Sequence, residues 1–248
     1  QEVGGVGQSA LLEAKVLVVG AGGLGSPLLM YLVAAGVGTI GVVDDDIVSL
    51  SNLQRQIAHG TPDIGRAKVD SARDRAAALN PEVTFVPYQQ RLNPDNVMGL
   101  LADYDIIADG SDNFATRFLL NDACFLAKKT LVSAAVLRFD GQLSTYKAHL
   151  GPPNPCYRCI FPEPPPLDAI PSCSQGGVLG AMAGVMGTMQ ATEVLKEILG
   201  IGDSLSGRLL IHDGLAGAVR TVRVKPDPSC ALCGETPTIV DLSLHGDT

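Results

Sequence analysis

Short apolar runs alternate with longer amphipathic stretches along the first two thirds of the chain. Runs such as Val16-Leu17-Val18-Val19 predict buried strands, and the stretches between them have the spacing of helices. The predicted strands span 15–19, 39–44, 84–88, 104–109 and 130–135. The predicted helices span 26–35, 68–79, 94–102 and 114–127. This alternation is typical of an α/β fold, a doubly wound, Rossmann-like and mostly parallel sheet with helices on both faces.

The last third of the chain has a different pattern. Segments 141–147, 208–213 and 218–224 predict strands of an antiparallel C-terminal extension, and 178–199 predicts a long apolar helix. Segment 151–171 holds eight of the 16 prolines, which favours an irregular excursion over the surface. We expect one domain over 1–248, made of two halves with these different patterns, 15–135 and 136–248.

Composition narrows the class of protein. With 248 residues, 46% of them hydrophobic, the chain can bury a large core without disulfides. A net charge of −8 argues against a broad basic surface for nucleic acid. No charge-free run is long enough to span a bilayer, since Glu193 and Lys196 interrupt 178–199. We therefore expect a cytoplasmic protein that binds neither nucleic acid nor membrane.

A glycine-rich loop follows the first predicted strand. Gly20-Ala21-Gly22-Gly23-Leu24-Gly25 lies between a strand and a helix, where glycines let the backbone approach phosphate and the helix N-terminus attracts anions. Asp44 closes the second strand and can accept hydrogen bonds from ribose hydroxyls. The alternative is a tight turn without a ligand. Taken alone, these residues favour an NAD-dependent oxidoreductase.

Two cations change this interpretation. A triphosphate carries more negative charge than the roughly +0.5 of one helix N-terminus can balance. Arg55 and Lys68 lie near the expected carboxyl edge of the sheet, where Arg55 can grip phosphate oxygens and Lys68 can stabilise charge at the α-phosphate. The alternative for each is an ordinary surface cation.

Asp112 follows the strand predicted at 104–109 and is expected at the same edge. A carboxylate there suits Mg²⁺, which binds one or two carboxylates together with phosphate oxygens. The competing interpretation makes Asp112 only the N-cap of the helix at 114–127.

Together these motifs resemble those of a known family. In order they are the glycine loop, Asp44, the run Ser51-Asn52-Leu53-Gln54-Arg55-Gln56, Lys68 and Asp112-Asn113. They resemble the ubiquitin-activating (E1-like) superfamily, most closely its bacterial molybdopterin-synthase adenylyltransferases and thiamine-pathway relatives (MoeB/ThiF type), and the resemblance covers nearly the whole chain.

The resemblance implies an activity and a site. The activity is ATP-dependent adenylation of the C-terminal glycine of a ubiquitin-like sulfur-carrier protein ending in Gly-Gly, with release of pyrophosphate. The residues implied to contact ATP or its metal are Gly23, Asp44, Ser51, Asn52, Arg55, Lys68, Asp112 and Asn113. The expected nucleotide site also includes Gly20, Gly22, Gly25, Leu53 and Gln54.

Four of the six cysteines form two Cys-x-x-Cys pairs, Cys156 with Cys159 and Cys230 with Cys233. Four thiolates match a closed tetrahedral Zn²⁺ site, which the resemblance implies to be structural. The alternatives are four reduced surface thiols or a redox pair, although a redox pair would leave the second motif unexplained.

Cys173 precedes the helix predicted at 178–199, where a helix N-terminus would favour a thiolate nucleophile. The resemblance implies covalent chemistry at this place in some relatives only, and the alternative is a small loop residue. Cys124 is expected in the core, and Met182, Met186 and Met189 in the core or a dimer interface. We leave His59, His149, His212 and His245 as unassigned surface or loop residues.

The resemblance also implies a homodimer in which an N-terminal arginine reaches the partner's ATP. No basic residue precedes Lys15, so we expect that this arginine was removed or lost and that activity is impaired. Few residues follow Cys233, so we expect a separate sulfur donor. The NAD-dependent oxidoreductase and a non-catalytic, zinc-stabilised scaffold remain as alternatives, and the sequence leaves the choice between molybdopterin, thiamine and another sulfur pathway open.

Overall fold

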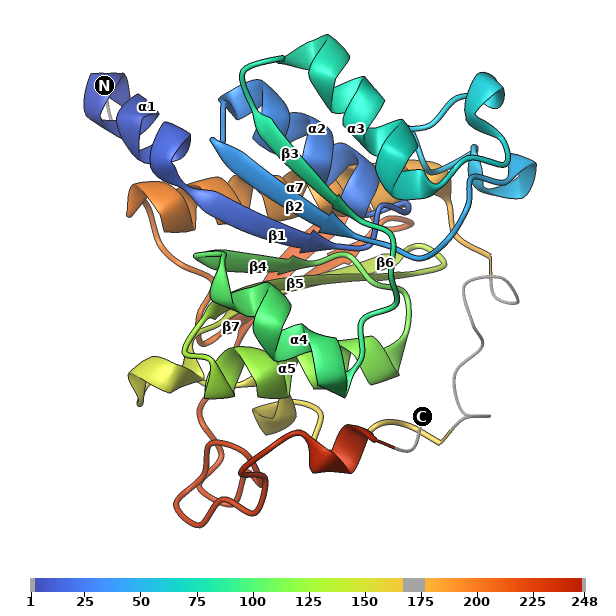
Figure 1. Ribbon diagram of the computed structural model, residues 1–248. Helices are drawn as coiled ribbons and strands as arrows, with labels where there is room; N and C mark the ends of the chain where they lie inside the picture. Colours follow the sequence, from blue (N-terminus) through green and yellow to red (C-terminus); the bar gives the residue numbers. More distant parts are fainter. Residues whose placement is uncertain (1–2, 167–176, 247–248) are drawn as a thin grey trace.

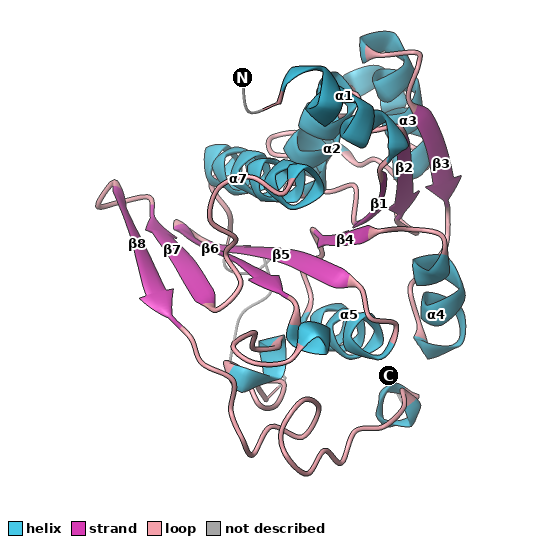
Figure 2. Cartoon of the chain, turned by 90° about the vertical axis from the view of Figure 1, so that its left-hand side faces the viewer, coloured by secondary structure: helices cyan, strands magenta, loops and turns pink. Residues whose placement is uncertain are grey.

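One eight-stranded sheet runs through the molecule (Figures 1 and 2), and the computed structural model describes residues 3–166 and 177–246. The strand order is β3-β2-β1-β4-β5-β6-β7-β8. The strands are β1 Lys15–Val19, β2 Thr39–Val43, β3 Thr84–Tyr88, β4 Ile106–Asp109, β5 Thr130–Leu137, β6 Asp140–Tyr146, β7 Arg208–Asp213 and β8 Ala218–Arg223. Neighbouring strands from β3 to β5 are parallel, and those from β5 to β8 are antiparallel. The predicted fold class is therefore confirmed.

Helices cover both faces of the parallel part (Figure 1). The helices are α1 Gly4–Glu13, α2 Gly25–Ala35, α3 Lys68–Leu79, α4 Pro94–Ala102, α5 Phe114–Leu126 and α7 Gly180–Leu199. One hydrophobic core forms between the sheet and α1, α2, α3 and α7, and a second forms under α4 and α5. No helix among the described residues is long and apolar enough to cross a membrane.

Strand β1 lies between the two cores, which explains its unbroken apolar sequence. Val16 and Val18 face the first core, and Leu17 and Val19 face the second. Because successive side chains of a strand point to opposite faces, a strand buried on both sides needs apolar residues at every position. The apolar run in the sequence is thus explained by two-sided burial.

The structure refines the predicted boundaries. Strand β2 ends at Val43, so Asp44 stands just beyond it, and β5 continues to Leu137. Helix α1 was not predicted, because three glycines and a mixed pattern gave no helical signal. It forms where Leu11 is buried and Gly7 approaches α7, since a Cβ on Gly7 would lie 3.1 Å from Leu199 Cδ2.

Helix α7 is hydrogen-bonded to the two adjacent strands β4 and β5. The buried Gln190 side chain donates hydrogen bonds from Nε2 to the carbonyl oxygens of Asp109 and Val132, at 2.8 and 3.0 Å. The Asp109 carbonyl ends β4, and the Val132 carbonyl lies within the first half of the neighbouring strand β5. Helix α7 thus holds the end of β4, after which the loop 110–113 of the candidate site begins.

Candidate nucleotide site and metal centre

The glycine loop joins β1 to α2 in a conformation that only glycine tolerates. Gly20 has φ +95°, and a Cβ on it would lie 2.9 Å from the carbonyl oxygen of Gly110. A Cβ on Gly25 would lie 1.8 Å from the carbonyl oxygen of Gly20. These glycines therefore let the loop turn sharply, contact the neighbouring β4 end and begin α2 beside β1.

Asp44 holds the glycine loop through its carboxylate. Its Oδ2 accepts a hydrogen bond from the Ala21 amide at 2.8 Å, and its Oδ1 accepts one from the Asp46 amide at 2.9 Å. Burial raises the pKa of Asp44, and the positive charge of Lys68 offsets only part of that rise. Each carboxylate oxygen keeps a lone pair, so Asp44 can still accept from a ribose hydroxyl.

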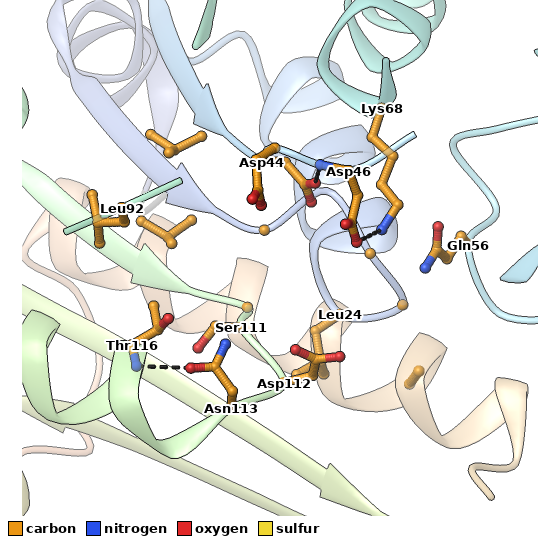
Figure 3. Close-up of a pocket in the computed structure, with 18 of the residues that line it drawn as sticks. Leu24, Asp44, Asp46, Gln56, Lys68, Leu92, Ser111, Asp112, Asn113 and Thr116 are labelled. Atoms are coloured by element: carbon orange, nitrogen blue, oxygen red, sulfur yellow. Dashed lines mark hydrogen bonds and ion pairs between the residues drawn. The ribbon is translucent and has the colours of Figure 1, made fainter. Parts of the chain in front are cut away.

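A cavity of about 330 Å³ opens in front of this loop (Figure 3). Several predicted site residues line it together: Gly20, Gly22, Gly23, Asp44, Arg55, Lys68, Asp112 and Asn113. They come from the loops after β1, β2 and β4 and from the start of α3. The cavity lies at the carboxyl edge of parallel strands, where α/β proteins bind ligands.

The two predicted cations are held by neighbouring side chains. Lys68 opens α3, is only 4% exposed, and places Nζ 2.8 Å from Asp46 Oδ2. Arg55 donates from an Nη atom to Asn52 Oδ1 at 3.1 Å. The alternative that each is an ordinary surface cation is therefore less well supported, because a neighbouring side chain orients each one and both line the cavity.

Asn113, and not Asp112, caps α5. The Asn113 side chain accepts a hydrogen bond from the Thr116 amide at 2.8 Å, the geometry of an N-cap. The alternative that Asp112 serves only as the cap is therefore wrong. Asp112 is exposed and lines the cavity (Figure 3), which leaves its carboxylate available to a ligand.

The remaining predicted contact residues lie outside the cavity lining formed by the described residues: Gly25, Ser51, Asn52, Leu53 and Gln54. Gly25 shapes the loop and Asn52 orients Arg55. The Ser51 hydroxyl lies 3.2 Å from that of Ser49. Gln54 contacts the start of α7, where a Cβ on Gly180 would lie 2.2 Å from the Gln54 carbonyl oxygen. Their contact with ATP stays a prediction.

Two histidines left as surface or loop residues have structural roles. His59 is 7% exposed and bonds to the Ala21 carbonyl and the Ser71 hydroxyl, and His245 Nε2 lies 2.8 Å from Asp122 Oδ2. His212 is also misassigned, because it lies within β7. Sequence spacing gave no signal for these roles, since the partners of His59 and His245 are distant in sequence.

The four cysteines of the two Cys-x-x-Cys pairs converge (Cys156, Cys159, Cys230 and Cys233), with all four Sγ atoms within 4.8 Å of one another. Three Sγ–Sγ distances are 3.9, 3.5 and 3.4 Å, too long for a disulfide. Zinc–sulfur bonds of about 2.3 Å in a tetrahedron place sulfurs about 3.8 Å apart. The geometry thus fits a Zn²⁺ ion, and the Asp227 amide donates to Cys159 Sγ at 3.3 Å.

A buried ionic cluster anchors the first cysteine pair to α5. Arg158 makes two hydrogen bonds to the carboxylate of Asp122, at 2.8 and 2.7 Å, and Asp122 is fully buried. Burial by itself would raise the pKa of Asp122, but the hydrogen bonds from Arg158 and His245 outweigh it and hold that pKa below its usual value. Asp122 therefore stays charged and joins α5, the cysteine loop and the C-terminal segment.

The predictions for the other sulfur-containing residues are confirmed for the core positions and untested for Cys173. Cys124 and Met186 are buried, as predicted for core residues. Met182 is also buried, and Met189 packs against the first core. Cys173, the predicted nucleophile, lies outside the described residues.

These features define an α/β protein that is built to bind a nucleotide phosphate. They are the glycine loop, Asp44 after β2, and Arg55 and Lys68 at the same sheet edge. The chain belongs to the ThiF family, which matches residues 1–232. This confirms the membership in the E1-like superfamily that the motifs indicated.

Similar proteins have names that agree with this family. The chain is 54% identical over 242 residues to adenylyltransferase and sulfurtransferase MOCS3 of Bos taurus, covering 97% of this chain and 52% of that protein. It is 48% identical over 239 residues to a sulfur carrier protein adenylyltransferase of Thermus thermophilus, covering 96% and 88%. The chain thus spans about half the length of the first relative and most of the second.

Solved structures of E. coli MccB share the fold. One in complex with MccA-N7isoASN has a TM-score of 0.81 at 20% identity, covering 92% of this chain and 69% of that one. Another, with ATP, has a TM-score of 0.79 at 19% identity, covering 91% and 68%. At this identity the likeness supports the architecture alone.

Proposed function

We propose that the protein adenylates the C-terminal glycine of a ubiquitin-like sulfur-carrier protein ending in Gly-Gly, with ATP and Mg²⁺, and releases pyrophosphate. One observation carries the proposal: the glycine loop, Arg55, Lys68 and Asp112 line a single cavity at the sheet edge. The names of the bovine and Thermus relatives support the choice of reaction and of substrate.

The proposed chemistry suits this set of side chains. A carboxylate oxygen of the carrier attacks the α-phosphorus of ATP, a new P–O bond forms, and the bond to pyrophosphate breaks. The attacking carboxylate is already ionised near neutral pH, so no general base is needed. Positioning and neutralisation of phosphate charge do most of the work, which is the role proposed for Arg55 and Lys68.

Two metals belong to the proposal. Asp112 would hold Mg²⁺ beside the phosphates, since its side chain is at the cavity and is not used as a cap. The four cysteines would hold a structural Zn²⁺, which keeps the segment between β6 and α7 joined to the segment after β8. In this proposal zinc takes no part in the reaction.

Two rivals receive less support. An NAD-dependent oxidoreductase leaves Arg55, Lys68 and Asp112 without a role at the cavity, and the relatives named above are adenylyltransferases. A non-catalytic, zinc-stabilised scaffold explains the cysteines but not the convergence of these charged residues.

We also propose a homodimer that works in the cytoplasm with a separate sulfur donor. Helices α1 and α2 pack against α7, and each of the three helices carries an exposed apolar side chain: Val6 on α1, Tyr31 on α2 and Val185 on α7. Such a surface favours contact with a second copy.

Cys-x-x-Cys thiols that stay reduced are typical of a cytoplasmic protein. Residues 15–135 would form the nucleotide half, and 136–248 the half that binds carrier and zinc.

The test is ATP–pyrophosphate exchange with a panel of carriers, including the small subunit of molybdopterin synthase and the thiamine sulfur carrier. We expect exchange with at least one carrier and none when its last glycine is deleted. Asp112→Asn should lower exchange by about 100-fold, whereas Asp95→Asn, a change on the surface of α4, should not.

The rivals predict other results. Binding of an ATP analogue without exchange on any carrier would favour the scaffold, and binding of NAD instead of ATP would favour the oxidoreductase.

A further inference from the structure

Side chains hold the peptide groups of Ala21, in the middle of the glycine loop, from both sides. The Ala21 amide donates to Asp44 Oδ2 at 2.8 Å, and the Ala21 carbonyl oxygen lies 2.9 Å from His59 Nε2. Ala21 is fully buried, and His59 is 7% exposed. The loop is thus fixed by two residues that are distant in sequence, of which Asp44 lines the cavity and His59 does not.

The chemistry of the contact assigns the protonation state of His59. A carbonyl oxygen can only accept, so Nε2 must carry the proton and donate to Ala21. In the neutral ring, Nδ1 is then an acceptor, and the Ser71 hydroxyl lies 2.9 Å from it. Burial is the main reason that the pKa of His59 is lowered, which favours this neutral ring.

This contact links the glycine loop to the helix that carries the phosphate-binding lysine. Ser71 lies one turn after Lys68 on α3, and Lys68 bonds to Asp46, whose amide donates to Asp44. Two chains of hydrogen bonds therefore connect α3 to Ala21. One runs through Asp46 and Asp44, and the other runs through His59.

We propose that His59 is a positioning residue for nucleotide binding, which holds the glycine loop at a fixed place relative to Lys68. Its ring does not line the cavity, so it acts through Ala21 and not through contact with the ligand. Without the Nε2 proton donor, a buried carbonyl loses a partner and the loop loses one of its two links to α3. The choice of ATP as ligand rests on the proposed function, whereas the positioning itself requires only that the cavity binds a nucleotide phosphate.

The test compares four substitutions by calorimetric binding of α,β-methylene-ATP with Mg²⁺ and by exchange kinetics. His59→Leu fills the space without a donor, and we expect the Kd for the analogue and the KM for ATP to rise about tenfold. The kcat of exchange should change less. His59→Gln keeps an amide donor for Ala21 and should restore Kd and KM to within about threefold of the parent protein.

Two further variants separate positioning from stability. Ser71→Ala removes the partner of Nδ1, together with a hydrogen bond to Asp63, and should raise Kd by about threefold, less than His59→Leu. It also covers the case in which His59→Leu fails to fold. His149→Leu, a partly exposed histidine outside the cavity lining, serves as the matched control and should leave Kd unchanged.

The outcomes are distinct. A folded His59→Leu protein with unchanged Kd and KM would overturn the inference, as would a Gln variant as weak as the Leu variant. If Leu does not fold, an unchanged Kd in Ser71→Ala would overturn it. Analogue binding that depends on His59 without exchange on any carrier would support the inference and contradict the proposed function. A parent protein that binds no analogue would contradict both.

Discussion

The nucleotide cavity and the cysteine cluster both gather residues that are distant in sequence, but they are held together differently. Around the cavity, Asp44, Lys68 and His59 bond to other protein groups, so the arrangement is complete without a ligand. In the cysteine cluster, the four sulfurs lie mainly against one another, in loops and short turns.

This difference indicates what each region depends on. A parallel sheet and its loops can pre-organise a binding site through hydrogen bonds and packing alone. Thiolates brought to within 4.8 Å of each other repel unless a cation neutralises them, so the proposed Zn²⁺ would be needed for the cluster to persist. We therefore expect substitutions to damage stability most at the cluster and activity most at the cavity.

The largest effect is expected from Cys230→Ser. Loss of one thiolate ligand should remove zinc and lower the free energy of unfolding by more than about 4 kcal/mol, a size typical of a lost metal site. Zinc content by elemental analysis and chemical denaturation would measure the two effects. Cys124→Ala, which changes a buried cysteine outside the cluster, should retain zinc. A Cys230→Ser protein of unchanged stability would show that the region does not depend on metal.

The second-largest loss of stability is expected from the buried ionic cluster of Asp122, Arg158 and His245. Asp122→Ala leaves the guanidinium of Arg158, 5% exposed, without its carboxylate, and should cost about 3–5 kcal/mol of unfolding free energy. Denaturation in urea would measure it. Asp103→Ala, at the exposed end of α4, should change stability by less than about 0.5 kcal/mol.

The same carboxylate predicts a pH dependence. Since the pKa of Asp122 is lowered by folding, the unfolded chain binds a proton first as the pH falls. The stabilising contribution is therefore complete above the unfolded pKa, near 3.8, and is lost as the pH falls through the lower folded value. Asp122→Asn should remove this part of the acid sensitivity. If the parent protein and Asp122→Asn lost stability equally as the pH fell, the assignment of this pH dependence to Asp122 would be contradicted.

The smallest effect on stability, and a large one on activity, is expected from Lys68→Ala. Its partner Asp46 is 68% exposed in its side chain, so losing the ion pair should cost at most about 1 kcal/mol. Exchange should nevertheless fall by at least about 100-fold, because a cation at the phosphates is removed. Arg73→Ala, on the exposed face of the same helix, is the matched control and should keep full exchange. Near-normal exchange by Lys68→Ala would remove Lys68 from the proposed mechanism.

The parallel half was predictable from the sequence because its signals are local. Apolar runs such as that of β1 follow from burial on both faces, and the glycine pattern before α2 follows from backbone conformations such as that of Gly20. The cysteine cluster was also predictable, because the spacing of each pair is a local signal for one metal. In each case a short stretch of sequence carried the physical constraint.

The parts that were missed depend on tertiary contacts. Helix α1 forms because Leu11 and Gly7 pack inside the fold, and the sequence around them has no helical pattern. His59 has partners 12 and 38 residues away along the chain, and His245 has one 123 residues away. Asn113 and Asp112 are both good capping residues, so only the structure decides which one takes that role.

The hydrogen bonds of Gln190 set an order in which the site can be completed as the chain leaves the ribosome. The glycine fingerprint spans residues 20–25, but Gly20 packs against Gly110, and the carbonyls of Asp109 and Val132 accept hydrogen bonds from Gln190, which is synthesised much later. A nascent chain therefore carries the nucleotide-binding motif long before it has a finished nucleotide-binding site.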